Sequence, residues 1–235
     1  MTKKLLSKSS VNLYLQCPLK WKYVYIDGIT SISSPAQQRG INIHKKIEDV
    51  YKKIKLVKKD KQIIPEIQIE PDAELNNFMK FENKRIQSCV DKEGKFDLIY
   101  FKPLFQELKM KNETIGLKGI CDAVYINPDD NGIIIVDWKT GKFHGEKLDD
   151  YRFELAVYAE LVRLCKKINV KYWAIYFTDQ DKLFFEKIEQ KYIEKMYSIV
   201  DSARRDMDRG MFDPKRNRYC YNCQFKNKCI LTANV

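Results

Sequence analysis

The sequence has no long apolar run. None of its segments approaches the roughly 20 consecutive apolar residues that a membrane-spanning helix needs, and the basic residues 1–8 are not followed by the apolar stretch of a secretory signal peptide. We therefore expect a cytoplasmic protein without a membrane partner. If the gene is viral, the expected compartment is the cytoplasm of the host cell.

Histidine is scarce, and the cysteines do not indicate a set of disulfide bonds. The 235 residues include only two histidines and seven cysteines, an odd number. An odd count without a secretory signal argues against a framework of disulfide bonds. The chain is long enough to bury an apolar core, so its stability need not come from disulfide bonds.

Acidic residues are outnumbered by basic ones. Lys and Arg total 43 against 32 Asp and Glu, which gives a formal net charge of +11. The basic residues recur along the chain, and this favours a polyanionic partner such as nucleic acid. A generally lysine-rich proteome is an alternative explanation that charge alone does not exclude.

The most informative stretch is residues 133–141, which read IIIVDWKTG. Its β-branched apolar run follows the turn-forming residues 127–132 and predicts a buried strand. Because residues two apart in a strand share a face, Asp137 and Lys139 should project together while Trp138 packs on the opposite side. The simpler alternative is an ordinary ion pair at a strand end.

Two further strands are predicted before this one, at residues 104–110 and 114–126. Short turns would join all three into an antiparallel meander. Regular alternation would put Cys121 and Ala123 on one face of the second strand and Asp122 on the other, among apolar neighbours. The strand register could bring Asp122 beside Asp137, where two carboxylates repel each other unless a metal neutralises them.

The rest of the chain indicates a mixed α/β protein. Helices are predicted at residues 9–16, 19–25, 35–55, 71–89, 148–167 and 190–209, a solvated basic connector at 55–61, and strands at 171–178 and 183–188. A strand, a helix and a strand in succession indicate parallel pairing. We predict a mixed central β-sheet flanked by helices in a single domain, residues 1–235, with a helical part at 9–95, a core sheet and helix at 96–190, and a C-terminal helix and lobe at 191–235.

Two predicted helices carry polar residues one turn apart. Gly40, His44 and Glu48 recur at every fourth position of the helix at residues 35–55. The helix at residues 148–167 likewise places Glu154 and Tyr158 on one face. Glycine would allow close approach of another backbone or a phosphate. A single histidine on a helix is more often capped or solvated than a metal ligand, so this pattern alone does not predict a metal site.

Three cysteines lie close together near the C-terminus, in the pattern Cys220-x2-Cys223-x5-Cys229 within a basic segment. Cysteines at this spacing commonly share a metal, and Cys17, at a break between two predicted helices, is the candidate fourth ligand. Such a site would connect the two ends of the chain. The spacing leaves three alternatives open, namely an iron–sulfur cluster, a zinc ion and an incidental grouping.

In this order, the motifs resemble those of the RecB-type branch of the PD-(D/E)XK nucleases. The cysteine pattern is similar to that of its iron–sulfur members, the CRISPR-associated Cas-four nucleases and the AddB-type nuclease domains. The resemblance spans residues 9–229, nearly the whole chain, and its specificity lies in the order of these motifs: Gly40-x3-His44-x3-Glu48, Gly119-x2-Asp122, Asp137-Trp138-Lys139-Thr140-Gly141 and Glu154-x3-Tyr158.

The resemblance implies a restriction-endonuclease-like core and a role for each of these residues. His44, Asp122, Asp137 and the backbone carbonyl of Trp138 would bind a catalytic Mg2+ or Mn2+, and hard oxygen ligands suit both ions. Asp122 and Asp137 would thereby act in catalysis with Lys139, which would orient the attacking water and steady the scissile phosphate. The cysteines would hold a structural [4Fe–4S] cluster, with Zn2+ as the alternative.

One position departs from the family pattern. The family usually carries glutamine where Glu154 stands, so the added charge would either weaken phosphate contact or supply another carboxylate near the metal. Tyr158 follows the pattern. With Glu48, both residues are candidates for substrate binding or an accessory role.

The function implied by the resemblance is a metal-dependent DNA nuclease that prefers single strands or DNA ends. We expect exonuclease behaviour, with endonuclease activity as an addition, in DNA processing such as recombination, repair or CRISPR-type adaptation. Protein partners would belong to the same complex. Two alternatives stay open, a catalytically silent DNA-binding or assembly subunit of the same fold and a zinc-binding nucleic-acid module.

Overall fold

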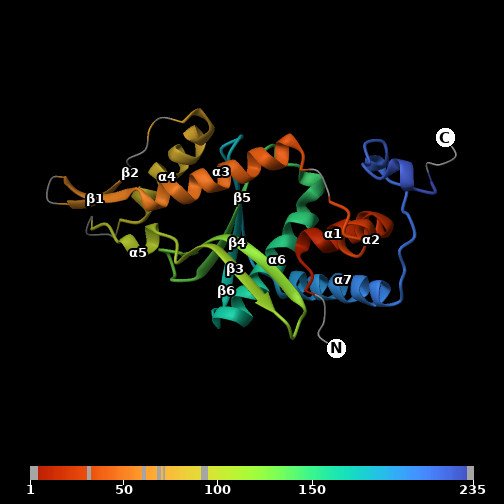
Figure 1. Ribbon diagram of the computed structural model, residues 1–235. Helices are drawn as coiled ribbons and strands as arrows, with labels where there is room; N and C mark the ends of the chain where they lie inside the picture. The colour runs from red at the N-terminus through yellow and green to blue at the C-terminus, as the bar shows by residue number, and fades with distance from the viewer. Residues whose placement is uncertain are drawn as a thin grey trace.

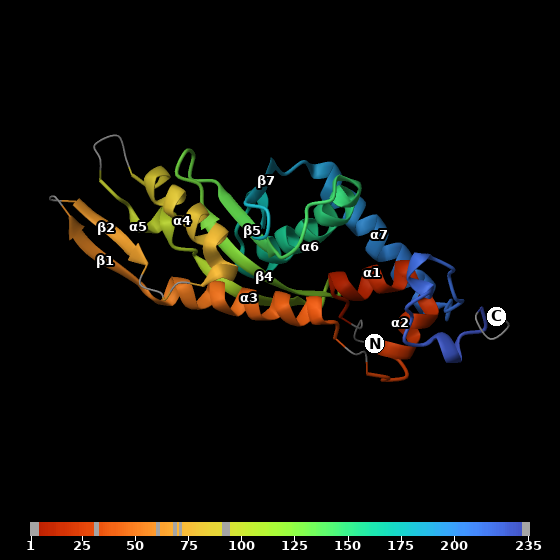
Figure 2. The ribbon, with the colours of Figure 1, turned by 90° about the horizontal axis from the view of Figure 1, so that it is seen from above.

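A central sheet with helices on both faces forms the body of the protein in the computed structural model (Figure 1). The structure describes residues 5–30, 33–59, 62–67, 70, 72–90 and 95–231. A small β-hairpin lies at one end of the molecule and the C-terminal segment at the other, and Figure 2 shows the same arrangement from above.

Two short helices open the described chain, as predicted. Helix α1, Lys8–Gln16, begins after Ser7, whose side chain accepts a hydrogen bond from the Ser10 backbone N–H. The chain is extended at Cys17, and Pro18 then begins α2, Pro18–Tyr25. Proline is well tolerated in the first helical turn because its missing N–H would have no helical partner there.

The prediction for residues 55–61 was wrong. Helix α3, Pro35–Lys52, is followed by β1, Ile54–Lys59, and β2, Gln62–Ile67, which pair as an antiparallel hairpin. The lysines of β1 interrupt its apolar alternation, so the backbone pairing with β2 was not visible in the sequence. Residues 60 and 61 lie outside the described residues.

The next helices differ from the prediction at their ends. The turn η1, Ala73–Leu75, precedes α4, Asn76–Ser88, and Asp72 caps the turn by accepting a hydrogen bond from the Glu74 N–H. Predicted residue 71 lies outside the described residues. A further short helix, α5, Leu98–Phe101, precedes the sheet, and the Asp97 side chain caps it by accepting a hydrogen bond from the Ile99 N–H.

The mixed sheet was predicted correctly and has the order β3-β4-β5-β6-β7. Helix α6 connects the parallel pair β5 and β6, and the other neighbouring strands are antiparallel. The bounds are β3 Phe105–Asn112, β4 Leu117–Ile126, β5 Ile133–Lys139, η2 Gly145–Lys147, α6 Leu148–Lys166, β6 Val170–Phe177, β7 Lys182–Lys187 and α7 Gln190–Asp208.

The two faces of the sheet are covered by different helices. Helices α1, α6 and α7 pack on one face around Ile135, Trp173 and Ile175, whereas α3 to α5 pack on the other around Val136 and Trp138. Alternation along β5 therefore turns its Asp and Lys side chains toward α6 and its Trp toward α4.

The alternation is interrupted in β3 and β4. Cys121 and Val124 both pack on the α6 side, although residues three apart in a regular strand face opposite sides. Phe105 and Leu108 do the same in β3. The predicted shared face of Cys121 and Ala123 was wrong, since Ala123 packs on the α3 side.

The two ends of the described chain lie together. The Tyr14 hydroxyl donates to the Met211 carbonyl at 2.6 Å, and the Tyr23 hydroxyl donates to the Lys228 carbonyl at 2.8 Å. Trp21 of α2 stacks on Phe212. Two short turns follow in the C-terminal segment, η3 Arg218–Cys220 and η4 Lys226–Lys228. No helix in the described part of the chain combines the length and the apolar character needed to cross a membrane.

Candidate active site

Two carboxylates come together where β4 and β5 separate. Ala123 pairs with Val136, so the next residues outward, Asp122 and Asp137, lie on adjoining strands as the sequence predicted. Asp122 is buried, and its Oδ2 accepts a hydrogen bond from the Trp138 N–H at 2.7 Å. The backbone of β5 therefore holds this carboxylate in place.

His44 reaches the same place from α3. Its Nε2 lies 2.7 Å from the Trp138 carbonyl oxygen, and its Nδ1 lies 3.4 Å from Asp122 Oδ1. Burial lowers the pKa of His44, but the hydrogen bond and negative charge of Asp122 outweigh it and raise that pKa to about 9. Three of the predicted metal ligands, His44, Asp122 and the Trp138 carbonyl, thus meet.

Glu107 also belongs to this group, although it stands in none of the sequence motifs. Donor atoms of His44, Glu107 and Asp122 all lie within 4.8 Å of one another. Gln106 pairs with Ala123 and Leu108 with Cys121, so Glu107 lies opposite Asp122. It has a φ of +45°, at the point where both strands lose their alternation, and such irregularities turn side chains toward sites. The cross-strand position was the signal that could have identified it.

The donor set suits a hard divalent cation. Carboxylate oxygens, a backbone carbonyl and one imidazole nitrogen are ligands that Mg2+ and Mn2+ accept. Burial and the nearby charge of Asp122 raise the pKa of Glu107 in the structure without ions. A cation at the centre of the group would remove that repulsion.

Lys139 lies between two buried carboxylates. Its Nζ is 2.7 Å from Asp137 Oδ2 and 2.9 Å from Glu154 Oε2. Asp137 Oδ2 accepts no hydrogen bond of ordinary geometry from the described residues, so its partner is this ion pair. Burial raises the pKa of Asp137, while both carboxylates together raise that of Lys139 above its usual range against the effect of burial.

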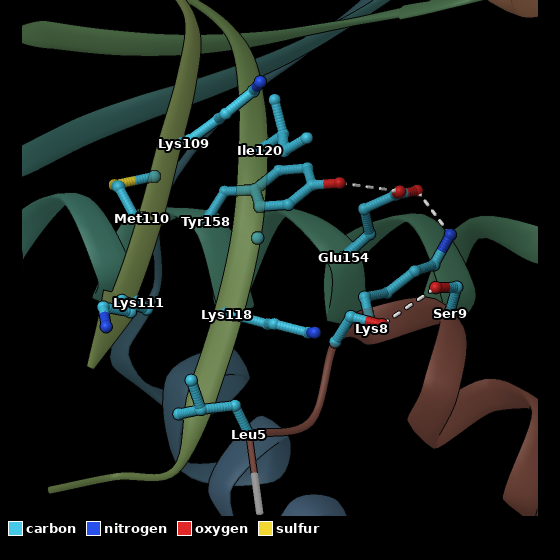
Figure 3. Close-up of a pocket in the computed structure, with 12 residues that line it drawn as sticks. Leu5, Lys8, Ser9, Lys109, Met110, Lys111, Lys118, Ile120, Glu154 and Tyr158 are labelled. Carbon is cyan, nitrogen blue, oxygen red and sulfur yellow. Dashed lines mark hydrogen bonds and ion pairs between the residues drawn. The ribbon is translucent and has the colours of Figure 1, made fainter. Parts of the chain in front are cut away.

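Glu154 contacts three donors, as Figure 3 shows in part. Its Oε2 also accepts a bond from Lys8 Nζ at 2.7 Å, and its Oε1 accepts one from the Tyr158 hydroxyl at 3.2 Å. Burial would raise the pKa of Glu154, but Lys139 and Lys8 lower it below the usual value. Lys8 was also missed, because nothing in the sequence relates two residues 146 positions apart.

The remaining motif residues surround this centre. Glu48 pairs with Lys52 at 2.7 Å, and its charge helps to raise the pKa of Glu107. A methyl group added at Gly40 would lie 3.5 Å from the Thr140 hydroxyl. At Gly119 it would lie 3.0 Å from the Tyr158 ring, so this glycine leaves room for that tyrosine.

The four predicted cysteines line one small cavity of their own, separate from this centre. Cys17, Cys220, Cys223 and Cys229 all contribute to it. Asn217 also lines the cavity, and its side-chain amide donates to the Gln16 carbonyl at 2.9 Å. The Asn217 backbone N–H donates to Cys220 Sγ, with 3.3 Å between nitrogen and sulfur. Within the described ranges, no three of these thiols lie within 4.8 Å of one another.

Comparisons with solved structures show the same fold. A candidate exonuclease from Eubacterium rectale has a TM-score of 0.53 and 14% sequence identity, and the match covers 99% of this chain and 88% of that one. A second structure, titled SSO0001, has a TM-score of 0.48 and 13% identity, with 98% and 88% of the two chains covered.

No curated protein matches the sequence. The family model described as "PD-(D/E)XK nuclease superfamily" matches residues 5–230, nearly the whole chain. That span includes His44, Glu107 and Asp122, whose donor atoms lie together, and the pair of Asp137 and Lys139 on the adjoining strand. The chain belongs to the PD-(D/E)XK nuclease superfamily.

Proposed function

We propose that this protein is a divalent-metal-dependent deoxyribonuclease of the RecB-type branch, acting on single strands or DNA ends as an exonuclease. The observation that carries the proposal is one compact group, in which His44, Glu107 and Asp122 place donor atoms within 4.8 Å and Lys139 lies on the adjoining strand. Hydrolysis of a phosphodiester needs a hard cation and a nearby positive charge, and these residues can supply both.

In this proposal, His44, Asp122, Asp137 and the Trp138 carbonyl hold Mg2+ or Mn2+, and Glu107 adds a ligand to the set. When bound, the ion polarises a phosphoryl oxygen and lowers the pKa of water. The hydrogen bond from the Trp138 N–H keeps Asp122 Oδ1 turned toward His44. The rigid β5 backbone thereby determines the ligand geometry.

Lys139 would orient the attacking water and stabilise the charge that develops on the phosphate. Glu154 fits a positioning role, because it contacts the Lys139 ammonium at 2.9 Å from α6. Lys8 and Lys139 both bind Glu154 Oε2 and neutralise its charge, so the glutamate is not a bare negative charge facing DNA. Tyr158 orients Glu154, and Glu48 acts only as an accessory charge.

We further propose that the four cysteines hold a [4Fe–4S] cluster that joins the two ends of the chain. What supports the proposal is that all four thiols line one cavity between the two ends of the chain, where a cluster bound by four cysteines would join those ends.

The role would be DNA processing such as recombination, repair or CRISPR-type adaptation, together with protein partners. The proposed organisation remains one domain, with the helical part at residues 9–95, the core at 96–190 and the cysteine lobe at 191–235.

The nuclease proposal is tested with metal-loaded protein and end-labelled single-stranded DNA in Mn2+. Lys139→Ala and Asp122→Ala should lower cleavage by at least about a hundredfold, because each removes a group that acts in the transition state. Lys142→Ala, an exposed lysine three residues away, is the matched control and should cleave normally. Undiminished cleavage by Lys139→Ala would refute the assignment, and tight DNA binding without cleavage by the wild type would favour a silent binding subunit.

The cysteine proposal has a readout that does not depend on activity. Anaerobically purified protein should contain iron and acid-labile sulfide in equal amounts and should absorb in the thiolate-to-iron charge-transfer region. Cys223→Ser should abolish both signals, whereas Cys165→Ser, at a thiol outside the cavity, should not. Stoichiometric zinc without iron would overturn the cluster.

A further inference from the structure

A groove lined by lysines lies beside the proposed active site. We call it the lysine groove; it has a volume of about 880 Å³ and is lined from β3, β4, α6 and the N-terminal segment (Figure 3). One carboxylate, Glu154, lines it and already binds Lys8 and Lys139. Its four lysines are Lys8, Lys109, Lys111 and Lys118.

The positive charge of the groove is poorly compensated. Lys111 and Lys118 lie directly opposite each other in the β3–β4 register, and like charges in that relation destabilise a sheet. Lys111 reaches Glu113 only at 3.7 Å, in an exposed pair. Lys118 and Lys109 form no ion pair within 4.0 Å in the described ranges, and the charge of Lys109 acts on the Glu107 carboxylate from farther away. An anionic ligand would relieve this repulsion.

Apolar groups lie among these lysines. Ile120 is paired with Lys109 across the strands and is 42% exposed, and Leu5 and Tyr158 also line the groove. A duplex presents mainly phosphates at its surface because its bases are stacked inside. Unpaired bases, in contrast, offer apolar faces next to phosphates, which is the combination that single-strand sites bind. The lining therefore favours a single strand over a duplex.

The groove leads to the proposed reaction centre. Tyr158 and Glu154 line it (Figure 3). Glu154 Oε2 is 2.9 Å from the Lys139 ammonium. A strand whose scissile phosphate is at Lys139 can thus continue along β3 and β4.

We propose that the lysine groove binds the part of a single-stranded DNA that adjoins the scissile phosphate. Lys109, Lys111 and Lys118 contact successive phosphates, and Ile120 contacts a base. This inference rests on the proposed nuclease function and specifies where its substrate lies.

The test measures binding of a fluorescein-labelled oligo(dT) to the whole protein in EDTA, so that no cleavage occurs, across a salt series. The double variant Lys109→Ala/Lys118→Ala should bind roughly tenfold more weakly at about 0.1 M salt. Its plot of log affinity against log salt should be shallower by about 1.4, because each lost phosphate contact on a single strand removes about 0.7. The control Lys80→Ala/Lys187→Ala removes two exposed lysines outside the groove and should match the wild type.

Two further binding measurements distinguish binding in the lysine groove from non-specific attraction between DNA and a basic protein. Ile120→Ser should weaken binding of oligo(dT) several-fold but leave an abasic oligonucleotide of equal length unaffected, because only bases contact the isoleucine. The lysine double variant should leave the affinity for a blunt duplex nearly unchanged. Equal losses for duplex and single strand, or an unchanged salt slope, would overturn the proposal.

Cleavage assays keep this result distinct from the nuclease proposal. The lysine double variant should raise KM and leave kcat close to that of the wild type, since it loses binding alone. If the wild type binds oligo(dT) through the groove but cleaves nothing, the nuclease function fails and the binding site stands.

Discussion

Replacing Lys8 and Glu154 with neutral residues, singly and together, tests whether the buried Glu154 carboxylate needs the N-terminal lysine. Glu154 Oε2 lies 2.7 Å from Lys8 Nζ and 2.9 Å from Lys139 Nζ. With Asp137, the four side chains carry two positive and two negative formal charges. Lys8→Met leaves one negative charge in excess and Glu154→Gln leaves one positive charge, whereas the double variant is again neutral.

The expected energies follow from burial and hydrogen bonding. A hydrogen bond to a charged group contributes about 1.5–3 kcal/mol to the free energy of unfolding. The Lys8 side chain is 22% exposed, so water replaces part of the bond, and we expect Lys8→Met to cost about 1.5–2 kcal/mol. With glutamine at position 154 the same Lys8→Met change should cost less than about 0.5 kcal/mol. The coupling energy of the pair is then about 1–2 kcal/mol.

Urea unfolding of the wild type, both single variants and the double variant measures this coupling. The exposed pair of Lys22 and Asp27, 2.8 Å apart, is the matched control, and the cycle of Lys22→Met and Asp27→Asn should give less than about 1 kcal/mol. Cleavage should follow the same order, falling about tenfold in Lys8→Met and recovering when Glu154→Gln is added. Additive unfolding energies, within about 0.5 kcal/mol, would refute the reasoning.

Three more outcomes are expected. Glu107→Gln should weaken Mn2+ binding about tenfold by calorimetry, since it removes a charged ligand; unchanged affinity would place Glu107 outside the metal site. Gly119→Ala puts a methyl group 3.0 Å from the Tyr158 ring and should displace that ring. Cleavage should then fall roughly tenfold while the melting temperature barely changes. A normal cleavage rate would mean that Tyr158 has no role. Arg85→Met strands the fully buried Glu82, 2.7 Å away, and should cost about 3–5 kcal/mol in urea unfolding; a loss below about 1 kcal/mol would contradict a buried ion pair.

Much of the sheet was predictable because its strands are strongly apolar. The run at residues 133–136 and the polar pair after it predicted both the strand and the shared face of Asp137 and Lys139. The hairpin of β1 and β2 was not predictable, since the two strands are stabilised by backbone pairing with each other and the lysines of β1 show no period of two.

The residues of the candidate active site were predictable only where they stand in a motif of characteristic spacing. His44 and Asp122 stand in motifs, and the structure brings them within 3.4 Å. Glu107 stands in no motif, and its place follows from the strand register and from a positive φ that alternation rules do not foresee. Lys8 is related to Glu154 only by the docking of α1, a tertiary contact that local patterns do not record.

The contact between the two ends of the described chain affects the order of events during synthesis. Tyr14 in α1 bonds to the Met211 carbonyl, 197 residues later, and Asn217 bonds to the Gln16 carbonyl, 201 residues earlier. At about 5–20 residues per second, the ribosome needs roughly 10–40 s to add the segment that receives α1. During that interval α1 lacks these two bonds, and nearby Leu6, which exchanges backbone hydrogen bonds with Gly116 and Lys118, positions Lys8. The contacts that fix α1, and with it Lys8, are therefore complete only when the segment around residues 211–217 has been added.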